Sequence, residues 1–340
     1  IVPLYTTLDA LNALEYFGRT AQYNQTLSLA PGIQATFNDA GHILGSACIL
    51  LEVSEDSHQR RIVFSGDLGL DRRPILRDPD KAPDADIVVM ETTYGDRQHK
   101  QLEPSIEELH EVINATMSRG GNVIIPTFAL ERAQEILFYL HAGKQEGVLP
   151  DFLQVFLDSP MAISATEIFR RHPECYDEHT ASLFASGHDP FQFSGLHFTR
   201  ESADSMAINQ IHSGAVIMAG SGMCTGGRIR HHLRQHLGRE HSSIVFVGYA
   251  AHGTLARRIV DGAKIVNIFG DEYPVRATIH TIGGFSAHAG QTELLEWHRQ
   301  TGNPEHTFLV HGEKDSMIAF SQLLKGTRVD MPELHQAFEL

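Results

Sequence analysis

The chain lacks long apolar runs and paired cysteines. No segment of its 340 residues approaches the roughly 20 apolar residues that a membrane-spanning helix needs, so we expect no membrane partner. Cys48, Cys175 and Cys224 are scattered and form no CxxC pair. Such an odd set favours free thiols in a reducing cytoplasm over a disulfide framework or a zinc knuckle. The first residues also lack the basic start and apolar stretch of a secretory signal. We therefore expect a cytoplasmic protein.

An excess of basic residues is also missing, since the formal net charge is −15 with neutral histidines. This charge counts against a protein that coats duplex nucleic acid through a broad basic surface. It leaves open an enzyme that grips a few phosphates in a local basic cleft. One basic patch lies on a predicted helix and comprises Arg228, Arg230, His231, His232, Arg234, His236 and Arg239. A solvated helix face explains this patch equally well, and its histidines are interpreted as surface or substrate-side residues rather than ligands.

Short apolar runs alternate with helical patterns along the whole chain. The stretch 105–117, for example, has acids in its first turn and a Gly-Gly stop, which predicts a helix. The stretch 175–198 is rich in Phe, Gly, His and Pro and is predicted to be irregular. The length suits two domains, and the alternation predicts α/β layers.

Five apolar runs stop at polar turns, and four of them lead to a His or a carboxylate. These four residues are Asp67, Glu91, His288 and His311, and the fifth run opens onto Gly220-Ser221-Gly222. In a buried sheet, ligands collect just beyond the ends of the strands. We therefore expect residues from distant parts of the chain to point at one place. His and Asp there indicate a metal, and Gly-Ser-Gly indicates a phosphate.

Three residues are candidate metal ligands, although each signal is weak alone. His42 lies in a turn with Gly41 and Gly45 on either side, which lets the backbone present the ring; a structural histidine is the alternative. Asp67 follows an apolar strand, where a buried carboxylate is costly unless it is paired or metal-bound. An Asx-turn or a helix cap is the alternative for Asp67. His311 has the same strand-end position.

Glu91 and His288 form a hypothetical pair. A carboxylate bonded to one imidazole nitrogen fixes the tautomer and frees the other nitrogen for proton transfer or phosphate contact. His288 also lies just before a predicted helix over 292–299, and a helix start suits a group that faces an anion.

Ser221 and Gly222 belong to a Gly-rich turn between a predicted strand and a predicted helix. Small residues there let backbone N–H groups approach a phosphate, although a simple tight turn is the alternative. The turn matches neither GxGxxG nor GxxxxGK[ST], so nucleotide binding of those kinds is poorly supported. His252 is interpreted as a polar residue near a helix start.

Nine motifs occur along the chain in this order: DAGHILGSA, FSGDLG, METTYGDR, IPTFALERAQEIL, LDSPMA, AGSGMCTGGRI, VGYAAHGTL, GGFSAHAGQ and LVHGE. Together they resemble the β-CASP branch of the metallo-β-lactamase-fold ribonucleases, and the resemblance covers essentially the whole chain. It implies an αββα metallo-β-lactamase fold interrupted by an α/β β-CASP domain. We expect residues 1–95 to form part of the first domain, 96–272 the β-CASP domain and 273–340 the return to the first domain.

The resemblance also implies roles for particular residues. His42, Asp67 and His311 match metal ligands, with Asp67 bridging two ions, and His288 matches the residue that contacts the scissile phosphate and helps the leaving group. Glu91 matches the acidic residue after the strand and joins Asp67 and His288 as a catalytic candidate. The substrate-binding candidates are Ser221, Gly222 and Arg228.

The implied reaction is zinc-dependent hydrolysis of RNA phosphodiester bonds, with two Zn²⁺ per intact active site and single-stranded RNA as the partner. Bound zinc lowers the pKa of water from about 15.7 towards 7. Endonuclease and 5′-exonuclease action both stay open. Members of this family often pair, so a homodimer is also open.

One family motif, HxHxDH, occurs nowhere in the 340 residues, and three ligands are too few for two catalytic zincs. We favour an N-terminally truncated sequence over a degenerate enzyme, because Ile1 is not Met and the downstream site residues are present. The first domain is then incomplete, and the 340 residues alone are expected to be inactive. The main alternative is a non-catalytic β-CASP scaffold subunit of an RNA-processing complex. A second alternative is a thioesterase or lactonase of the same superfamily, but the long inserted domain argues against it.

Overall fold

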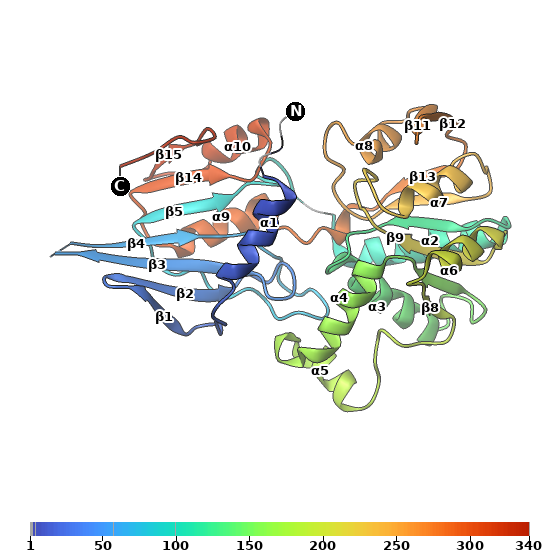
Figure 1. Ribbon diagram of the computed structural model, residues 1–340, viewed down its shortest axis with the longest axis horizontal. Helices are drawn as coiled ribbons and strands as arrows, with labels where there is room; N and C mark the ends of the chain where they lie inside the picture. The colour runs from blue at the N-terminus through green and yellow to red at the C-terminus, as the bar shows by residue number, and fades with distance from the viewer. Residues whose placement is uncertain (1–2, 4, 57, 99, 340) are drawn as a thin grey trace.

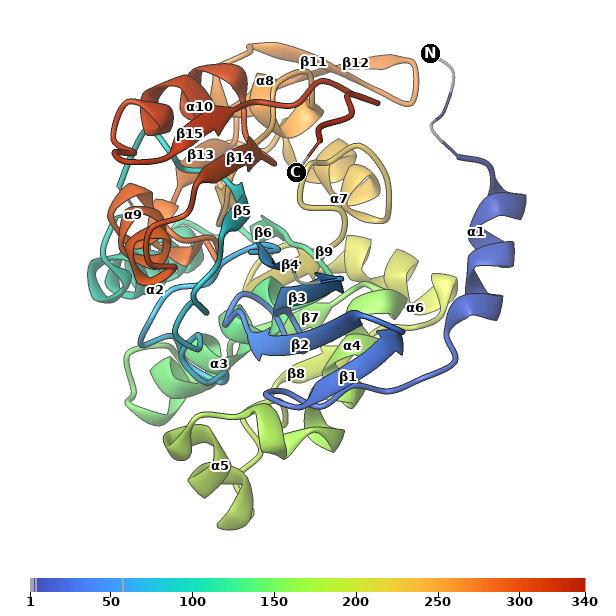
Figure 2. The same ribbon diagram turned by 90° about the vertical axis from the view of Figure 1, so that its left-hand side faces the viewer.

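Two β-sheets lie side by side in the computed structural model, which describes residues 3, 5–56, 58–98 and 100–339 (Figure 1). The first sheet has seven strands in the order β1-β2-β3-β4-β5-β14-β15. Its strands are β1 Thr26–Ala30, β2 Ile33–Asp39, β3 Ala47–Glu55, β4 His58–Phe64, β5 Ile87–Glu91, β14 His306–Val310 and β15 Arg328–Asp330. The helices drawn beside it are α1 Thr7–Ala13, α9 Gln291–Gln300 and α10 Lys314–Ser321. No residue of α1 is buried, and Figure 2 shows this helix apart from the sheet.

The direction of the strands decides where the turns of the first sheet emerge. Strands β4, β5 and β14 are parallel neighbours, so their carboxyl ends share one edge. Strand β2 is antiparallel to β3, and β3 is antiparallel to β4, so β2 ends at that same edge. The turns after these four strands therefore emerge together.

The second sheet has six parallel strands in the order β13-β10-β6-β9-β7-β8. Its strands are β6 Val123–Pro126, β7 Gln154–Leu157, β8 Leu196–Phe198, β9 Ala215–Ala219, β10 Ser243–Phe246 and β13 Thr278–Thr281. The helices around it are α2 Leu102–Ser118, α3 Arg132–Gln145, α4 Pro160–Arg171, α5 Glu178–Ala185, α6 Ser202–Ala207, α7 Ile229–His236 and α8 Leu255–Val260. Short 3₁₀ turns occur at η1 Leu14–Tyr16, η2 Pro173–Cys175, η3 Ile208–Gln210 and η4 Gly283–Phe285, and β11 Ile265–Ile268 pairs with β12 Asp271–Pro274.

Both faces of the second sheet are buried. Val123 and Ile125 of β6 belong to a core shared with α2, α3 and α4, whereas Ile124 belongs to a core shared with α7 and α8. This division follows from the alternation of side chains along a strand, and burial on both faces explains the continuous apolar runs in the sequence. The mixed α/β architecture agrees with the prediction.

Several elements differ from the sequence-based expectation. The stretch 175–198, predicted to be irregular, contains the helix α5, whose first turn is capped by the side chain of Asp177. Strand β13 pairs with β10, so the second sheet extends past residue 272. The domain bounds at 95 and 272 stay predictions. None of the described helices is long and apolar enough to cross a bilayer.

Candidate metal centre

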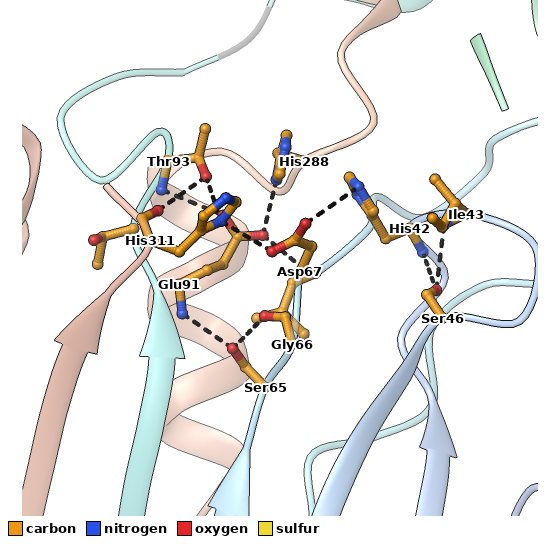
Figure 3. A network of polar contacts seen from close by, with 12 residues as sticks. His42, Ile43, Ser46, Ser65, Gly66, Asp67, Glu91, Thr93, His288 and His311 are labelled. Carbon is orange, nitrogen blue, oxygen red and sulfur yellow. Dashed lines mark hydrogen bonds and ion pairs between the residues drawn. The ribbon is translucent and has the colours of Figure 1, made fainter. Parts of the chain in front are cut away.

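Five of the predicted site residues gather at one edge of the first sheet (Figure 3). Asp67 follows β4, Glu91 ends β5, and His311 follows β14. His42 lies in the turn after β2, and His288 comes from the segment between η4 and α9. The structure thus brings together the residues that the strand-end argument selected.

Asp67 lies between two imidazoles. Its Oδ1 is 2.9 Å from His311 Nδ1, and its Oδ2 is 3.8 Å from His42 Nε2. The hydrogen bond from His311 lowers the pKa of Asp67, and the same bond raises the pKa of His311. Burial, together with the nearby His288, lowers the pKa of His42 to about 4. His42 is therefore neutral at pH 7, the form in which imidazole binds a metal.

The donor atoms fit a zinc ion. Ligand atoms of His42, Asp67 and His288 lie within 4.8 Å of one another, and so do those of Glu91, His288 and His311. His42 is buried and directs Nε2 towards Asp67. Imidazole nitrogens and carboxylate oxygens are donors that zinc takes. These residues form a candidate metal-ligand set.

The hypothesised contact between Glu91 and His288 is present. His288 Nδ1 is 3.1 Å from Glu91 Oε1, which also accepts from the backbone N–H of Leu68 at 2.6 Å. Glu91 Oε2 accepts from the backbone N–H of Thr93 at 3.3 Å, and Glu91 is only 1% exposed. One buried carboxylate therefore holds both His288 and the turn that carries Asp67. With Nδ1 donating to Glu91, a neutral His288 keeps Nε2 free as an acceptor.

Close backbone approaches fix the turns that carry the histidines. A Cβ on Gly69 would lie 1.9 Å from the carbonyl oxygen of Gly41, beside His42. A Cβ on Gly312 would lie 2.4 Å from Thr92 Oγ1. His311 itself has a φ of 47°, a left-handed conformation that is uncommon for a residue with a side chain. Both turns thus depend on glycine.

A cleft of about 910 Å³ opens over these side chains and is lined from both sheets. Gly222 lines it, together with Phe128 and Met161, whereas the lining residues in the described chain do not include Ser221 or Arg228. His252, interpreted from sequence as a helix-start residue, also lines the cleft, 3.7 Å from Glu313 and with its side chain 70% exposed.

Arg228 donates to the protein's own acceptors. Its guanidinium bonds Asp158 Oδ1 at 2.7 Å, Thr199 O at 2.8 Å and Arg200 O at 2.7 Å. These contacts argue against a phosphate ligand and indicate that Arg228 positions the Gly-rich turn. Ser221 Oγ accepts from the backbone N–H of Gly226 at 3.3 Å, inside the same turn. Contact of either residue with substrate stays a prediction.

A buried carboxylate organises this part of the second sheet. Asp158 is 0% exposed and accepts from His232, Ser205, Thr199 and Arg228 at 2.6–2.7 Å. Burial alone would raise the pKa of Asp158, but these hydrogen bonds lower it to about 2.

The interpretation of the basic patch is wrong for two of its histidines. His232 is 1% exposed and His236 is 0% exposed, so both lie in the interior rather than on the surface. The buried Asp158 is the hydrogen-bond partner of His232, at 2.6 Å.

A buried charged cluster joins the two sheets and was missed in the sequence. Arg73, which follows β4, bonds Glu135 of α3 at 3.2 Å, and it donates to Gly284 O at 2.8 Å and to Ser286 O at 2.6 Å. Glu131 Oε2 accepts from the backbone N–H of Leu44 at 3.2 Å, two residues beyond His42. The segments that carry His42 and His288 are therefore both tied to charged residues at the junction. The only sequence signal was the position of Glu131 and Glu135 in the IPTFALERAQEIL motif.

Comparisons with known proteins agree with this geometry. Residues 133–259 match the model of the Beta-Casp domain, and residues 272–332 match that of the Zn-dependent metallo-hydrolase RNA specificity domain. The chain is 40% identical over 322 residues to the protein named Ribonuclease TTHA0252 of Thermus thermophilus, which covers 95% of this chain and 72% of that protein. It is 33% identical over 326 residues to Transcription termination factor FttA of Pyrococcus abyssi, covering 93% of this chain and 49% of that protein. The factor of the same name from Methanosarcina mazei is 32% identical over 307 residues, covering 87% of this chain and 47% of that protein.

The chain belongs to the metallo-β-lactamase-fold ribonucleases that carry a β-CASP domain. The predicted family and α/β fold class are thereby confirmed. It spans about half the length of the archaeal relatives. The match to the zinc-dependent metallo-hydrolase domain supports a metal cofactor and a hydrolase.

Proposed function

We propose that this protein is a zinc-dependent ribonuclease that hydrolyses phosphodiester bonds of single-stranded RNA by a two-metal mechanism. The observation that carries the proposal is the position of Asp67, which has one carboxylate oxygen towards His311 and the other towards His42. A carboxylate with each oxygen facing a different imidazole suits a ligand that bridges two ions. Zinc, when bound, would supply Lewis-acid polarisation of a phosphate oxygen and a lowered pKa of bound water.

The site residues of the chain have separate roles in metal binding and proton transfer. His42, Asp67 and His311 would hold metal, and Glu91 orients the ring of His288 through the 3.1 Å contact at Nδ1. When Nε2 of His288 has taken up a proton, it would pass that proton to the leaving oxygen, while Glu91 stabilises the charged ring. General acid catalysis of this kind contributes about 10²–10⁴-fold to the rate.

Two ions need more ligands than these residues offer, and HxHxDH is absent from the 340 residues. We therefore propose that the 340 residues alone do not sustain cleavage. The missing motif also favours the second candidate, a non-catalytic β-CASP scaffold subunit that binds RNA. The bonded Glu91–His288 pair beside Asp67 supports the enzyme instead.

The test uses the product of the complete reading frame, loaded with zinc, and a labelled single-stranded RNA. Asp67→Ala and His288→Ala are each expected to abolish cleavage. Asp84→Ala is a matched control, since the side chain of Asp84 is 74% exposed and 3.9 Å from its nearest ionic partner, Arg61. Undiminished cleavage by the Asp67 variant would refute the assignment. An unmodified protein that binds RNA, binds no zinc and yields no cleavage products would favour the scaffold.

The cytoplasmic location and the homodimer stay proposals. The free thiols of Cys48, Cys175 and Cys224 support the first, and the second rests on the family resemblance alone. Analytical ultracentrifugation of the same product tests the homodimer, and a single species of monomer mass contradicts it.

A further inference from the structure

A large apolar side chain stands exposed in the cleft. Phe128 lies two residues after the end of β6, is 49% exposed and lines the same cleft as the metal centre. Met161, near the start of α4, also lines the cleft and is 74% exposed. Single exposed apolar residues are common on protein surfaces, so exposure alone assigns no role.

The ring of Phe128 has a defined place against the backbone. A Cβ on Gly222 would lie 3.0, 3.1 and 3.3 Å from three atoms of this ring, which is closer than most side chains tolerate. Gly222 therefore makes room for the ring, and the Gly-rich turn after β9 supports it. Phe128 nevertheless stays 49% exposed to solvent.

The cleft offers few free cations for an RNA backbone. No lysine occurs among the described residues that line it. Arg97 donates to both oxygens of Asp96 at 2.8 and 2.7 Å, and Arg132 is buried and paired with Glu135. The chain as a whole carries a net charge of −15. Side-chain attraction to phosphates is therefore weak here, and a bound strand needs contacts through its bases.

We propose that Phe128, supported by Gly222, is a stacking platform for one nucleobase of a single-stranded RNA in the cleft. The inference rests on the proposed function and adds to it a base contact apart from the metal centre. Stacking needs an unpaired base, so the platform favours single strands over duplexes. It is sequence-tolerant, because every base has a π face.

The experiment measures kcat and KM of the zinc-loaded product of the complete reading frame on a single-stranded RNA. Phe128→Ala and Phe128→Leu are expected to raise KM by about 5- to 150-fold, equivalent to about 1–3 kcal/mol, with little change in kcat. Phe128→Trp keeps a stacking surface and retains the original KM. Phe152→Ala is the matched control, since Phe152 is 67% exposed but outside the cleft lining.

A second substrate series locates the base. Bases are removed one at a time from the RNA, and removal of the stacked base raises KM for the unmodified protein but leaves KM of the Phe128→Ala variant unchanged. Equal KM values for the unmodified protein and both the Ala and Leu variants overturn the platform and leave the ribonuclease proposal intact. If the unmodified protein cleaves no RNA, the ribonuclease proposal fails. Fluorescence anisotropy with the same RNA then tests the stacking platform. Weaker RNA binding by Phe128→Ala supports the platform, and unchanged binding overturns it.

Discussion

Replacing Arg73 tests how strongly the junction of the two sheets positions the metal centre. The Arg73 side chain is 13% exposed and makes three hydrogen bonds to segments that include Glu135 and Ser286. Arg73→Met keeps a similar length of apolar chain but removes the charge and every donor. Glu135 keeps its pairing with Arg132, so the carboxylate left behind is still compensated.

The expected loss follows from the bonds removed. Each hydrogen bond from a charged group is worth about 1.5–3 kcal/mol, and breaking a buried ion pair costs about 3–5 kcal/mol. Because Arg132 remains beside Glu135, we expect Arg73→Met to lower the free energy of unfolding by about 3 kcal/mol. The segment of Gly284 and Ser286 leads directly to His288, and a displacement of about 1 Å there lowers kcat by about 10²-fold.

Urea unfolding at pH 7 measures the stability change, and RNA cleavage by the zinc-loaded product of the complete reading frame measures kcat. Arg60→Met is the matched control, since it removes an exposed ion pair with Glu305 that is worth less than about 1 kcal/mol. Equal stability and equal kcat for Arg73→Met and Arg60→Met would show that the junction does not position His288.

Three further outcomes are expected. Gly69→Ala places a Cβ 1.9 Å from Gly41 O and should destabilise the protein by about 3 kcal/mol in thermal unfolding. Gly18→Ala is the control, since its Cβ meets nothing within 4 Å and should cause no such loss. Equal losses of stability in the two variants would contradict this expectation. Asp158 has a pKa lowered to about 2, so its contribution is full above the unfolded pKa near 3.8 and is lost as the pH falls through 2. The stability gap between the unmodified protein and Asp158→Asn should therefore shrink by about 2 kcal/mol between pH 4 and pH 2 in urea unfolding, and a constant gap would count against the buried network. RNA affinity should fall with salt with a log–log slope shallower than about −2, and a slope near −5 would reveal more phosphate-binding cations than the few that the described cleft lining offers.

The convergence of the site residues could be predicted because it depends on local signals. Strands β5 and β14 are largely buried, and β4 is apolar near its carboxyl end, so each has a short apolar run followed by a polar turn. Parallel neighbours end at one edge, and Asp67, Glu91 and His311 follow from that rule alone. The neighbour order of the strands has no such local signal.

Arg73 and His232 could not be predicted, because their partners lie far away in sequence. Arg73 bonds residues 62 and 211 positions later, and His232 bonds Asp158 across 74 positions. A basic residue in a helical pattern is normally exposed, and only a carboxylate brought close by the tertiary fold makes its burial tolerable. For the same reason the contact of Arg228 with Asp158, 70 positions away, could not be predicted.

The two passages of the chain between the sheets are bonded to each other. Gln291 donates from its backbone N–H to Arg97 O at 3.0 Å and from Nε2 to Gly95 O at 2.7 Å. The whole second sheet and its helices thus leave and re-enter at neighbouring points. A domain inserted in this way can be lengthened, shortened or exchanged during evolution without disrupting the first sheet. The two points of the first sheet's chain to which it is joined already lie next to each other, so a changed insert need not bridge a new distance.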